Sequence, residues 1–385
     1  MHILFLPSWY PANESDLAGT FFREQAEAFL LAGHRVGVLN VRGIAVYSRS
    51  QLRGRKSGIR HFLDSGFDTY LWDRVLPFPK VPGGNERILL NAWRTLLHRY
   101  IDDNGRPDVL HAHTMFPAGL VTHALSEEFK IPFIVTEHRI SSLPLLAGRW
   151  NGPRGRAAAK AASALVAVAP DFAPALDQAY GLSKWEYVPG LLSPQFEDIT
   201  VRPTPNGPFT FGHVSYMDPH KNVDLLIHAF ADRFHGDPDV RLRIAGHSSF
   251  TQDLIDLAAS RGISDQVDFV GAVPRSGIVG EFSRYHAFVM PSRTEAFGTV
   301  LWEAMACGLP LVSTDTWAGR NAVREGNGLL VGVEQRDELG EALVSMRKTF
   351  ADYDPHHIRS ICVNHCARDA FVGQYSKLYA DAVAA

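Results

Sequence analysis

The chain has 385 residues, which is long for one hydrophobic core and about right for two α/β domains. Hydrophobic residues make up 46% of the chain and charged residues 21%, a balance that excludes an intrinsically disordered protein. The formal net charge of −3 argues against a nucleic-acid-binding protein, which would be strongly basic.

Cysteine usage and the N-terminus bear on where the protein works. The cysteines are Cys307, Cys362 and Cys366. A disulfide framework uses an even and larger number of cysteines, so three argue against one. The N-terminal apolar run, Ile3–Leu6, is too short for a signal peptide or a membrane span, and His2–Leu6 is predicted to form a buried strand. We therefore expect a protein of the reducing cytoplasm.

Short apolar runs alternate with longer helical stretches, which is the pattern of parallel sheets covered by helices. In the first half a helix is expected from Phe21 to Ala32, and Gly33 follows it as a typical helix terminator. The strands predicted for this half are His2–Leu6, Val36–Asn40, Val109–His113, Phe133–Thr136 and Ala164–Val168.

The stretch from Val41 to Leu63 holds six basic residues and no acidic one. A helical stretch rich in Leu and Trp, Glu86–Tyr100, follows it. One interpretation is a mobile basic loop beside a core-packed helix. The other is that both segments rest on an anionic membrane, which would place the protein peripherally at the inner membrane face. The basic residues are Arg42, Arg49, Arg53, Arg55, Lys56 and Arg60.

Three prolines between residues 203 and 208 surround Asn206-Gly207, which predicts an interdomain linker. We therefore expect one domain over residues 1–200, a second over 201–365, and a C-terminal helix, 366–385, that packs back on the first. Beyond the linker, the predicted strands are Thr210–Val214, Arg241–Ala245, Val267–Val270, Ala287–Met290 and Leu311–Ser313, and the predicted helices are Val223–Arg233, Thr251–Arg261, Val300–Cys307 and Arg336–Phe350.

The segment that follows the predicted strand ending at Met290 suits a phosphate ligand. Glu295 and Gly298 lie on a loop and a helix begins near Thr299, so free N–H groups and the positive end of the helix dipole meet there. Glu303 lies about 6 Å further along the helix axis, in an otherwise apolar run. A lone acid there is unfavourable unless it binds something, for which ribose hydroxyls are suited; solvated surface charges are the alternative interpretation.

A second segment, His213–Phe230, predicts a strand, a loop and an amphipathic helix. Lys221 stands just before that helix, at the carboxyl end of the strand, where its ammonium group could neutralise a diphosphate. An ordinary surface lysine is an equally good interpretation of its position alone.

These stretches together resemble the retaining glycosyltransferases of family 4, which have the GT-B fold. The segment Glu295–Glu303 is similar to that family's motif of two glutamates with seven residues between them, and Ala304–Ser313 continues it. The resemblance extends over nearly the whole chain. The other stretches that carry it are Pro7–Pro11, Gly19–Ala26, His111–His113, Thr136–His138, Val188-Pro189 with Phe196, Arg241–Gly246 and Val267–Gly271.

The resemblance implies two Rossmann-like domains that face each other across a cleft. It implies that a hexose-type sugar is transferred, with retention of configuration, from a nucleotide-diphosphate sugar (UDP by default) to a hydroxyl group of a glycan, lipid-linked or small-molecule acceptor. No metal ion or cofactor is expected. Retention without a well-placed protein nucleophile implies front-face attack, in which the leaving phosphate takes the acceptor's proton.

By the same resemblance, the second domain supplies most of the donor site. Glu303 would bind the ribose, Glu295 the hydroxyls of the donor sugar, and Lys221 the diphosphate, the last two taking part in catalysis. The other expected contacts are the backbone N–H groups of Phe297, Gly298 and Thr299, and Val273 on the loop that meets the base.

In the first domain, the resemblance implies that Gly19 allows close approach to the phosphates and that His138, the third residue expected to take part in catalysis, contacts the donor sugar near the reacting carbon. Two positions depart from the family pattern. Tyr216, which is expected at the donor site, stands where the family usually has an arginine, five residues before the lysine, and His247-Ser-Ser replaces a glycine-rich segment after Gly246.

Other functions stay open at this point. An epimerase or a phosphorylase could share the two-domain architecture, and a non-catalytic nucleotide-sugar-binding protein is supported by Tyr216. A nicotinamide-dependent dehydrogenase is disfavoured, because the first strand, loop and helix lack the Gly-x-Gly-x-x-Gly pattern.

Overall fold

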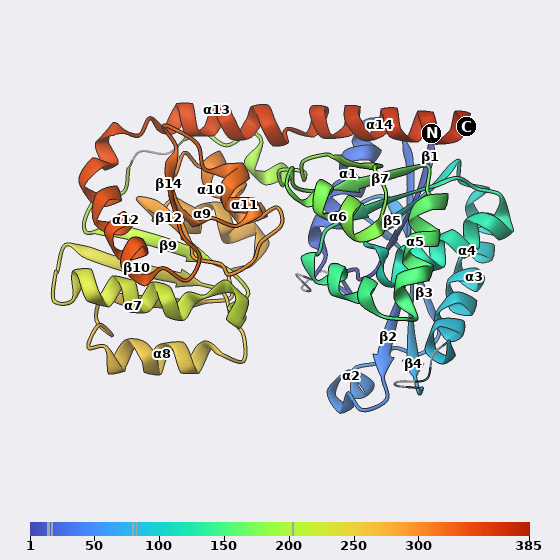
Figure 1. The fold of residues 1–385 in the computed structure, drawn as a ribbon, viewed down its shortest axis with the longest axis horizontal. Coiled ribbons are helices and arrows are strands. Elements are labelled where there is room, and N and C mark those ends of the chain that lie inside the picture. Colours follow the sequence, from blue (N-terminus) through green and yellow to red (C-terminus); the bar gives the residue numbers. More distant parts are fainter. Residues whose placement is uncertain (14–15, 17, 79–80, 82, 202–203) are drawn as a thin grey trace. The chain divides into compact units, whose positions relative to one another are not determined.

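The computed structural model describes residues 1–385 apart from 14–15, 17, 79–80, 82 and 202–203, and Pro203 of the predicted linker is thus outside the described residues. It divides into two compact units (Figure 1). Unit 1 comprises Met1–Leu191 with Asp369–Ala385, and unit 2 comprises Leu192–Arg368. Each unit is a mainly parallel sheet with helices around it, which confirms the predicted fold class of two Rossmann-like α/β domains.

The described residues of unit 1 form an eight-stranded sheet with the order β3-β4-β2-β1-β5-β6-β7-β8. Strands β3 and β4 pair antiparallel, and the other neighbours pair parallel. The strands are β1 His2–Pro7, β2 Arg35–Ala45, β3 Ile59–Asp64, β4 Phe67–Leu76, β5 Val109–His113, β6 Phe133–Glu137, β7 Ala164–Ala167 and β8 Trp185–Tyr187. The helices are α1 Thr20–Leu31, α2 Arg49–Arg53, α3 Gly84–Asn104, α4 Leu120–Phe129, α5 Asn151–Ala161, α6 Phe172–Tyr180 and α14 Arg368–Ala384, with short helical segments at Met115–Gly119 and Ile140–Ala147.

The C-terminal helix α14 belongs to the core of unit 1. Its residues Phe371, Tyr375 and Tyr379 recur at helical spacing and are buried in one cluster with Phe5 of β1 and Phe29 of α1. The three aromatic rings of α14 lie 5.4–6.1 Å from the ring of Phe29. The last helix of the chain therefore completes the core that the first strand and helix begin.

The prediction of a mobile basic loop between β2 and β4 is wrong. Strand β2 runs on to Ala45 instead of ending at Asn40, α2 follows, and β3 then pairs with β4 (Figure 1). The buried carboxylate of Asp73 on β4 holds this segment together: it accepts hydrogen bonds from Arg42 and from the backbone of Lys56, and it lies 3.7 Å from Arg60. The acid that pairs with Arg42 and Arg60 thus lies outside the segment in the sequence.

The prediction of a core-packed helix after this segment is confirmed. Helix α3 extends the expected Glu86–Tyr100 to Gly84–Asn104, and its apolar residues Trp93, Leu96 and Leu97 are fully buried. The apolar face of α3 is therefore occupied by the core and is not available to a membrane. In the described part of the chain, no helix is long and apolar enough to cross a membrane.

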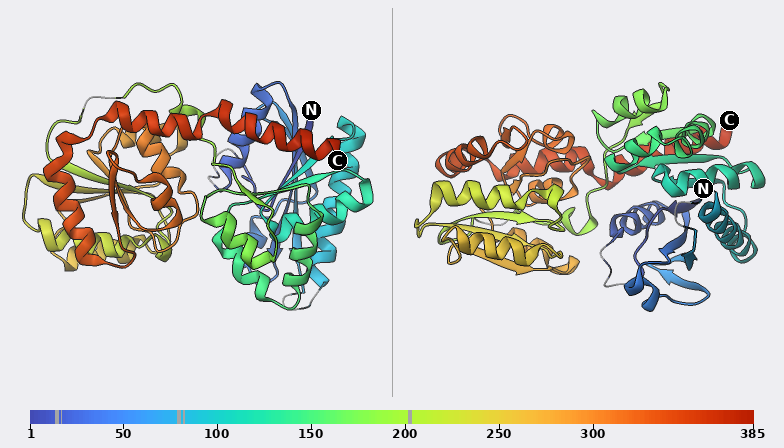
Figure 2. Two further views of the ribbon diagram at one scale, coloured as in Figure 1. Left: turned by 45° about the horizontal axis from the view of Figure 1, so that its top comes forward. Right: turned by 60° about the horizontal axis from the view of Figure 1, so that its bottom comes forward.

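The described residues of unit 2 form a parallel sheet with the order β11-β10-β9-β12-β13-β14. Helices α7, α8 and α12 share one core cluster with the sheet, and α10 packs against β12, β13 and α13. Figure 2 shows both units from two further sides. The strands are β9 Phe209–Val214, β10 Val240–Ala245, β11 Val267–Gly271, β12 Ala287–Met290, β13 Leu311–Thr314 and β14 Gly328–Val331. The helices are α7 Val223–Phe234, α8 Thr251–Ser260, α9 Ile278–Phe282, α10 Thr299–Ala306, α11 Trp317–Ala322, α12 Arg336–Thr349 and α13 Pro355–Cys366, with short turns at Pro194–Phe196, Pro219–Lys221, Arg275–Gly277 and Phe350–Asp352.

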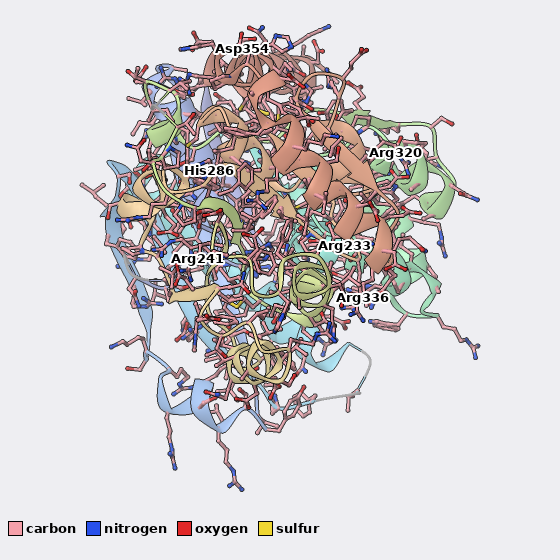
Figure 3. All side chains as sticks on the ribbon, turned by 90° about the vertical axis from the view of Figure 1, so that its left-hand side faces the viewer. Arg233, Arg241, His286, Arg320, Arg336 and Asp354 are labelled. Atoms are coloured by element: carbon pink, nitrogen blue, oxygen red, sulfur yellow. The ribbon has the colours of Figure 1, made fainter. Side chains whose placement is uncertain are left out.

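Surface ion pairs join two helices on one face of unit 2. Arg336 of α12 contacts Asp232 of α7 at 2.6 Å, and Arg233 of α7 contacts Glu341 of α12 at 2.9 Å. Figure 3 labels the two arginines. Exposed pairs of this kind contribute little stability each, so the buried cluster beneath them is what holds α7 and α12 together.

The centre of the unit 2 sheet depends on a glycine. Gly212 of β9 lies against the buried ring of Tyr285, whose hydroxyl donates a hydrogen bond to Glu281 at 2.7 Å. A Cβ atom added to Gly212 would lie 2.0 Å from a ring carbon of Tyr285. Because the ring is buried and its hydroxyl is hydrogen-bonded, the ring cannot move aside without losing packing contacts and the hydrogen bond to Glu281.

We predict that Gly212→Ala destabilises unit 2 by about 1–3 kcal/mol, the usual cost of overpacking a core. Gly280→Ala is the matched control, because no atom lies within 4 Å of a Cβ added to that glycine of α9. The control should be stabilising by about 0.5–1 kcal/mol, since alanine suits a helix better than glycine. Urea unfolding of both variants measures the difference, and equal midpoints would show that the contact with Tyr285 is not restrictive.

Candidate functional site

The predicted site residues of unit 2 gather at the carboxyl ends of its strands. The strand order places β9 beside β12 at the centre. From β9 the chain continues to β10, toward one edge strand, and from β12 to β13, toward the other. Ligands of such sheets bind at the carboxyl ends of the strands where the order reverses. The predicted residues on the loops and helix starts that follow β9, β11 and β12 are Tyr216, Lys221, Val273, Glu295, Phe297, Gly298, Thr299 and Glu303.

Lys221 and Glu295 are in direct contact. The Lys221 ammonium donates a hydrogen bond to a carboxylate oxygen of Glu295, and each side chain is 18% exposed. Lys221 ends the short turn Pro219–Lys221, and Asn222 then takes a left-handed backbone conformation at the start of α7. The structure thus places next to each other a cation and a carboxylate that are 74 positions apart in the sequence.

Helix α10 begins at the predicted place. Gly298 has a φ of 66° and precedes Thr299, the first helical residue. A Cβ atom at Gly298 would lie 3.0 Å from Cβ of Ala318, so both the conformation and the space favour glycine. The side chain of Phe297 is buried and stacks on Trp302, with 5.7 Å between ring centroids. The first N–H groups of a helix have no acceptor within it, so they remain suited to an anion.

Glu303 is only 1% exposed, and its carboxylate lies 2.7 Å from the Arg275 guanidinium. Arg275 belongs to the short turn that follows β11 and the loop carrying Val273. Sequence reasoning missed Arg275, because nothing in the spacing links it to Glu303. The buried carboxylate is therefore paired with a cation and is not solvated, which excludes the interpretation of Glu303 as a solvated surface charge.

His213 holds the ends of the two central strands together. It is fully buried, with Nδ1 2.8 Å from the carbonyl oxygen of Val289 on β12 and Nε2 2.8 Å from the hydroxyl of Ser215. Burial lowers the pKa of His213 to about 4, so the ring is neutral at neutral pH. It fixes the start of the loop that carries Tyr216 and Lys221.

Neither departure from the family pattern adds a positive charge to the site. Tyr216 is 70% exposed and carries none. Gly246 has a φ of 132°, and an added Cβ atom would lie 1.8 Å from the carbonyl oxygen of Ser215, so glycine is required there. Ser248 follows, and its hydroxyl donates to the carbonyl oxygen of Met217 at 2.9 Å and accepts from the backbone of Phe250. The serine joins the loops after β9 and β10 in place of further glycines.

The other two predicted residues, Gly19 and His138, belong to unit 1. Gly19 precedes α1 with a φ of 82°, and a Cβ atom there would lie 2.9 Å from the ring of Trp9. His138 follows β6, and its ring lies 5.4 Å and 5.3 Å from those of Phe21 and Phe22 at the start of α1. In unit 1, His138 thus lies beside the N-terminus of α1, which Gly19 precedes.

The described residues contain no group of three or more His, Cys, Asp or Glu side chains placed to hold a metal ion. The three cysteines are free thiols, and burial raises the pKa of Cys362 and Cys366. The thiol of Cys362 donates to the carbonyl oxygen of Trp302 at 3.1 Å, so it serves the packing of α13 on α10.

Comparison with known families and proteins gives a consistent result. Residues 18–191 match the family described as Glycosyltransferase Family 4, and residues 195–348 match Glycosyl transferases group 1. The D-inositol 3-phosphate glycosyltransferase of Frankia alni is 30% identical over 257 residues, 58% of this chain and 61% of that protein. The protein of the same name from Streptosporangium roseum is 30% identical over 254 residues, covering 59% and 58%. The chain thus spans about three-fifths of the length of these curated relatives.

Solved structures show the same fold. Sucrose-phosphate synthase from Thermosynechococcus elongatus matches with a TM-score of 0.76 and 19% identity over all of both chains. HepE of Anabaena, in its complex with UDP and glucose, matches with a TM-score of 0.72 and 19% identity, covering 98% of this chain and 99% of that one.

Proposed function

We propose that this chain, which belongs to the family 4 glycosyltransferases and has their GT-B fold, transfers a hexose-type sugar from a nucleotide-diphosphate sugar to an acceptor hydroxyl, with retention of configuration. UDP is the default nucleotide, and the acceptor is a glycan, a lipid-linked sugar or a small molecule. The observation that carries the proposal is the contact of Lys221 with Glu295 beside the first turn of α10.

That contact suits the two sides of the bond that the reaction breaks. In a nucleotide sugar a phosphate oxygen is bonded to the anomeric carbon, so a cation for the phosphate and a carboxylate for the sugar hydroxyls must be close together. In the free chain Lys221 and Glu295 neutralise each other. A bound donor would replace this pairing with ammonium to phosphate and carboxylate to hydroxyl contacts, so neither charge would be left without a partner.

Glu303 fits the ribose in the same arrangement. A carboxylate has two oxygens and accepts up to about four hydrogen bonds, so it can hold Arg275 and two vicinal hydroxyls together. Arg275 then acts as a positioning residue, because it fixes the carboxylate that meets the ribose. Val273, two residues earlier on the same segment, is assigned to the base.

The chemistry needs charge stabilisation at the leaving diphosphate. As the bond from the anomeric carbon to the phosphate oxygen breaks, Lys221 and the N–H groups from Phe297 to Thr299 would stabilise the negative charge without a metal ion. The acceptor oxygen bonds to the anomeric carbon on the same face, and its proton passes to the leaving phosphate. In unit 1, His138 is assigned a polar contact with the donor sugar, and Gly19 the close approach to the phosphates.

The rival functions are not favoured. The relatives from Frankia alni and Streptosporangium roseum are both named glycosyltransferases, and neither is named an epimerase or a phosphorylase. Tyr216 removes one positive charge, yet Lys221 and the start of α10 remain at the site, so a purely non-catalytic role has no further support.

We expect the two glutamates to separate binding from transfer. Glu303→Ala should weaken UDP binding by about 10- to 100-fold, because hydrogen bonds to a charged group contribute about 1.5–3 kcal/mol. Glu295→Ala should bind UDP almost normally, since Lys221 keeps its charge, while transfer falls by about 100- to 1,000-fold. Calorimetry and release of UDP measure these effects, and Glu325→Ala, an exposed acid of unit 2, is the control. Wild-type UDP affinity in both variants would refute the ribose assignment.

On the acceptor side, we propose that the protein is cytoplasmic and that it rests peripherally on the anionic inner face of a membrane through α2. Arg49, Arg53, Arg55 and Lys56 are exposed on α2 and the loop after it, and Tyr47 just before α2 is 75% exposed. Exposed cations beside an exposed aromatic side chain suit the surface of an anionic bilayer. A lipid-linked acceptor would then be held near the enzyme.

Co-sedimentation with vesicles tests this contact. Phosphatidylserine vesicles should bind the chain at low salt and release it at high salt, and Arg53→Glu with Arg55→Glu should weaken binding by about tenfold or more, at about 1 kcal/mol per basic residue. The control changes two exposed lysines elsewhere, Lys348→Glu with Lys377→Glu. An equal loss of vesicle binding in both double variants, or equal binding to neutral vesicles, would contradict the membrane contact. Only the hypothesis of an acceptor in solution would then remain.

A further inference from the structure

Three histidines lie on one face of the unit 1 sheet. His111 and His113 alternate along β5, and His138 follows Thr136 of β6 by two residues. Thr136 is the register partner of His113, and alternate residues of a strand point to the same side. The ring centroids of His111 and His113 are 4.0 Å apart, and Nδ1 of His113 lies 3.1 Å from Nε2 of His138.

All three rings are uncharged near neutral pH. Burial lowers the pKa of His111 and of His113 well below the ordinary value. Burial, and then the positive charge of Arg139, lower the pKa of His138 to about 3. A neutral imidazole has one N–H donor and one acceptor nitrogen. In the contact between His113 and His138, one ring must therefore donate and the other accept.

The surroundings of His113 decide which ring donates. Its other nitrogen, Nε2, is buried and has no hydrogen-bond partner among the described residues. If His138 donated to Nδ1 of His113, the hydrogen of His113 would be on Nε2, and a buried N–H would be unpaired. Unpaired buried N–H groups are rarer than unpaired acceptors, because a donor has only one hydrogen to place. The hydrogen of His113 is therefore assigned to Nδ1, directed at His138.

We infer that His113 is a positioning residue for His138: by donating its Nδ1–H to Nε2 of His138, it fixes the tautomer in which His138 carries its own hydrogen on Nδ1. The described residues offer this Nδ1 no hydrogen-bond partner, so its N–H remains available to a ligand. Under the proposed function, on which the identity of that ligand rests, the N–H donates to an oxygen of the donor sugar.

His111 has a different role. Its two ring nitrogens lie 2.7 Å from the hydroxyl of Tyr379 on α14 and 2.8 Å from the hydroxyl of Thr136. Both nitrogens are thus occupied, and neither contacts His138. His111 joins β5 to α14 and forms the wall behind His113, so its loss would affect packing but not the tautomer of His138 directly.

Long-range ¹H–¹⁵N spectra of the histidine-labelled full chain test the assignment, because protonated and unprotonated ring nitrogens differ widely in ¹⁵N shift. His138→Gln identifies the signals of His138. The wild-type spectrum should show His138 with its hydrogen on Nδ1. His113→Phe keeps a ring of similar size without a donor and should convert His138 to the Nε2–H tautomer. His113→Asn keeps a side-chain N–H and should preserve the wild-type pattern.

Kinetics give the second readout. His113→Phe should lower kcat by about 10- to 100-fold, as the loss of a residue that orients a metal-binding histidine does in metalloenzymes, while the KM for the donor changes little. His113→Asn should recover most of the rate, and His123→Phe, on α4 of the same unit, should leave both spectrum and rate unchanged.

The inference is overturned if wild-type His138 has its hydrogen on Nε2, or if His113→Phe leaves the His138 signals in place. The spectra do not depend on sugar transfer. A chain that shows the expected tautomers but transfers no sugar would overturn the proposed function and leave the pairing of His113 with His138 intact.

Discussion

The site of unit 2 depends on the pairing of each buried or half-buried carboxylate with a cation from another loop. Glu303, which is almost completely buried, lies against Arg275, and Glu295 lies against Lys221. A carboxylate in such surroundings is costly unless it is paired and hydrogen-bonded. The two ion pairs therefore stabilise the acidic side chains at the carboxyl ends of the strands when no ligand is bound. A ligand with phosphate and hydroxyl groups would replace the contacts of these ion pairs with contacts of its own.

The rest of each unit keeps these groups in place. In unit 2, His213 joins the ends of β9 and β12, and Gly246 lets the loop after β10 meet the loop after β9. In unit 1, the hydroxyls of Tyr375 and Tyr379 reach Thr136 and His111, so α14 is tied to the strands that end at His113 and beside His138. Packing and polar contacts together hold the functional side chains on rigid strands and helix starts, which is what a preorganised site requires.

Local features were predictable from the sequence. Every predicted strand begins within one residue of its expected start, because apolar runs bounded by turn residues carry that information. The start of α10 after Gly298 was predictable for the same reason, since helix termini have their own sequence signals. The strands β3, β4, β8 and β14 and the helices α2, α4, α5, α6, α9, α11 and α13 were not predicted. The shortest of them, such as β14, α9 and α11, have too few residues to show a clear period.

Features that depend on the meeting of distant segments were not predictable. Asp73 pairs with two arginines of the basic segment from outside it, and β3 is an edge strand with a weak alternation of buried and exposed residues. The partnership of Arg275 with Glu303 requires the turn after β11 to reach α10. The contact of His113 with His138 requires the register of β5 on β6. A single sequence does not show which of these distant residues come into contact.

A calorimetric titration of the purified chain with nucleoside diphosphates, in the presence of EDTA, asks directly whether the paired charges of unit 2 form a nucleotide site. We expect UDP or another nucleoside diphosphate to bind without a metal ion. Lys221→Met, which keeps the length of the side chain but removes its charge, should weaken this binding by about tenfold or more. Binding that appears only after Mg²⁺ or Mn²⁺ is added, or that is unaffected by Lys221→Met, would contradict the assignment of Lys221 and the α10 start to the diphosphate.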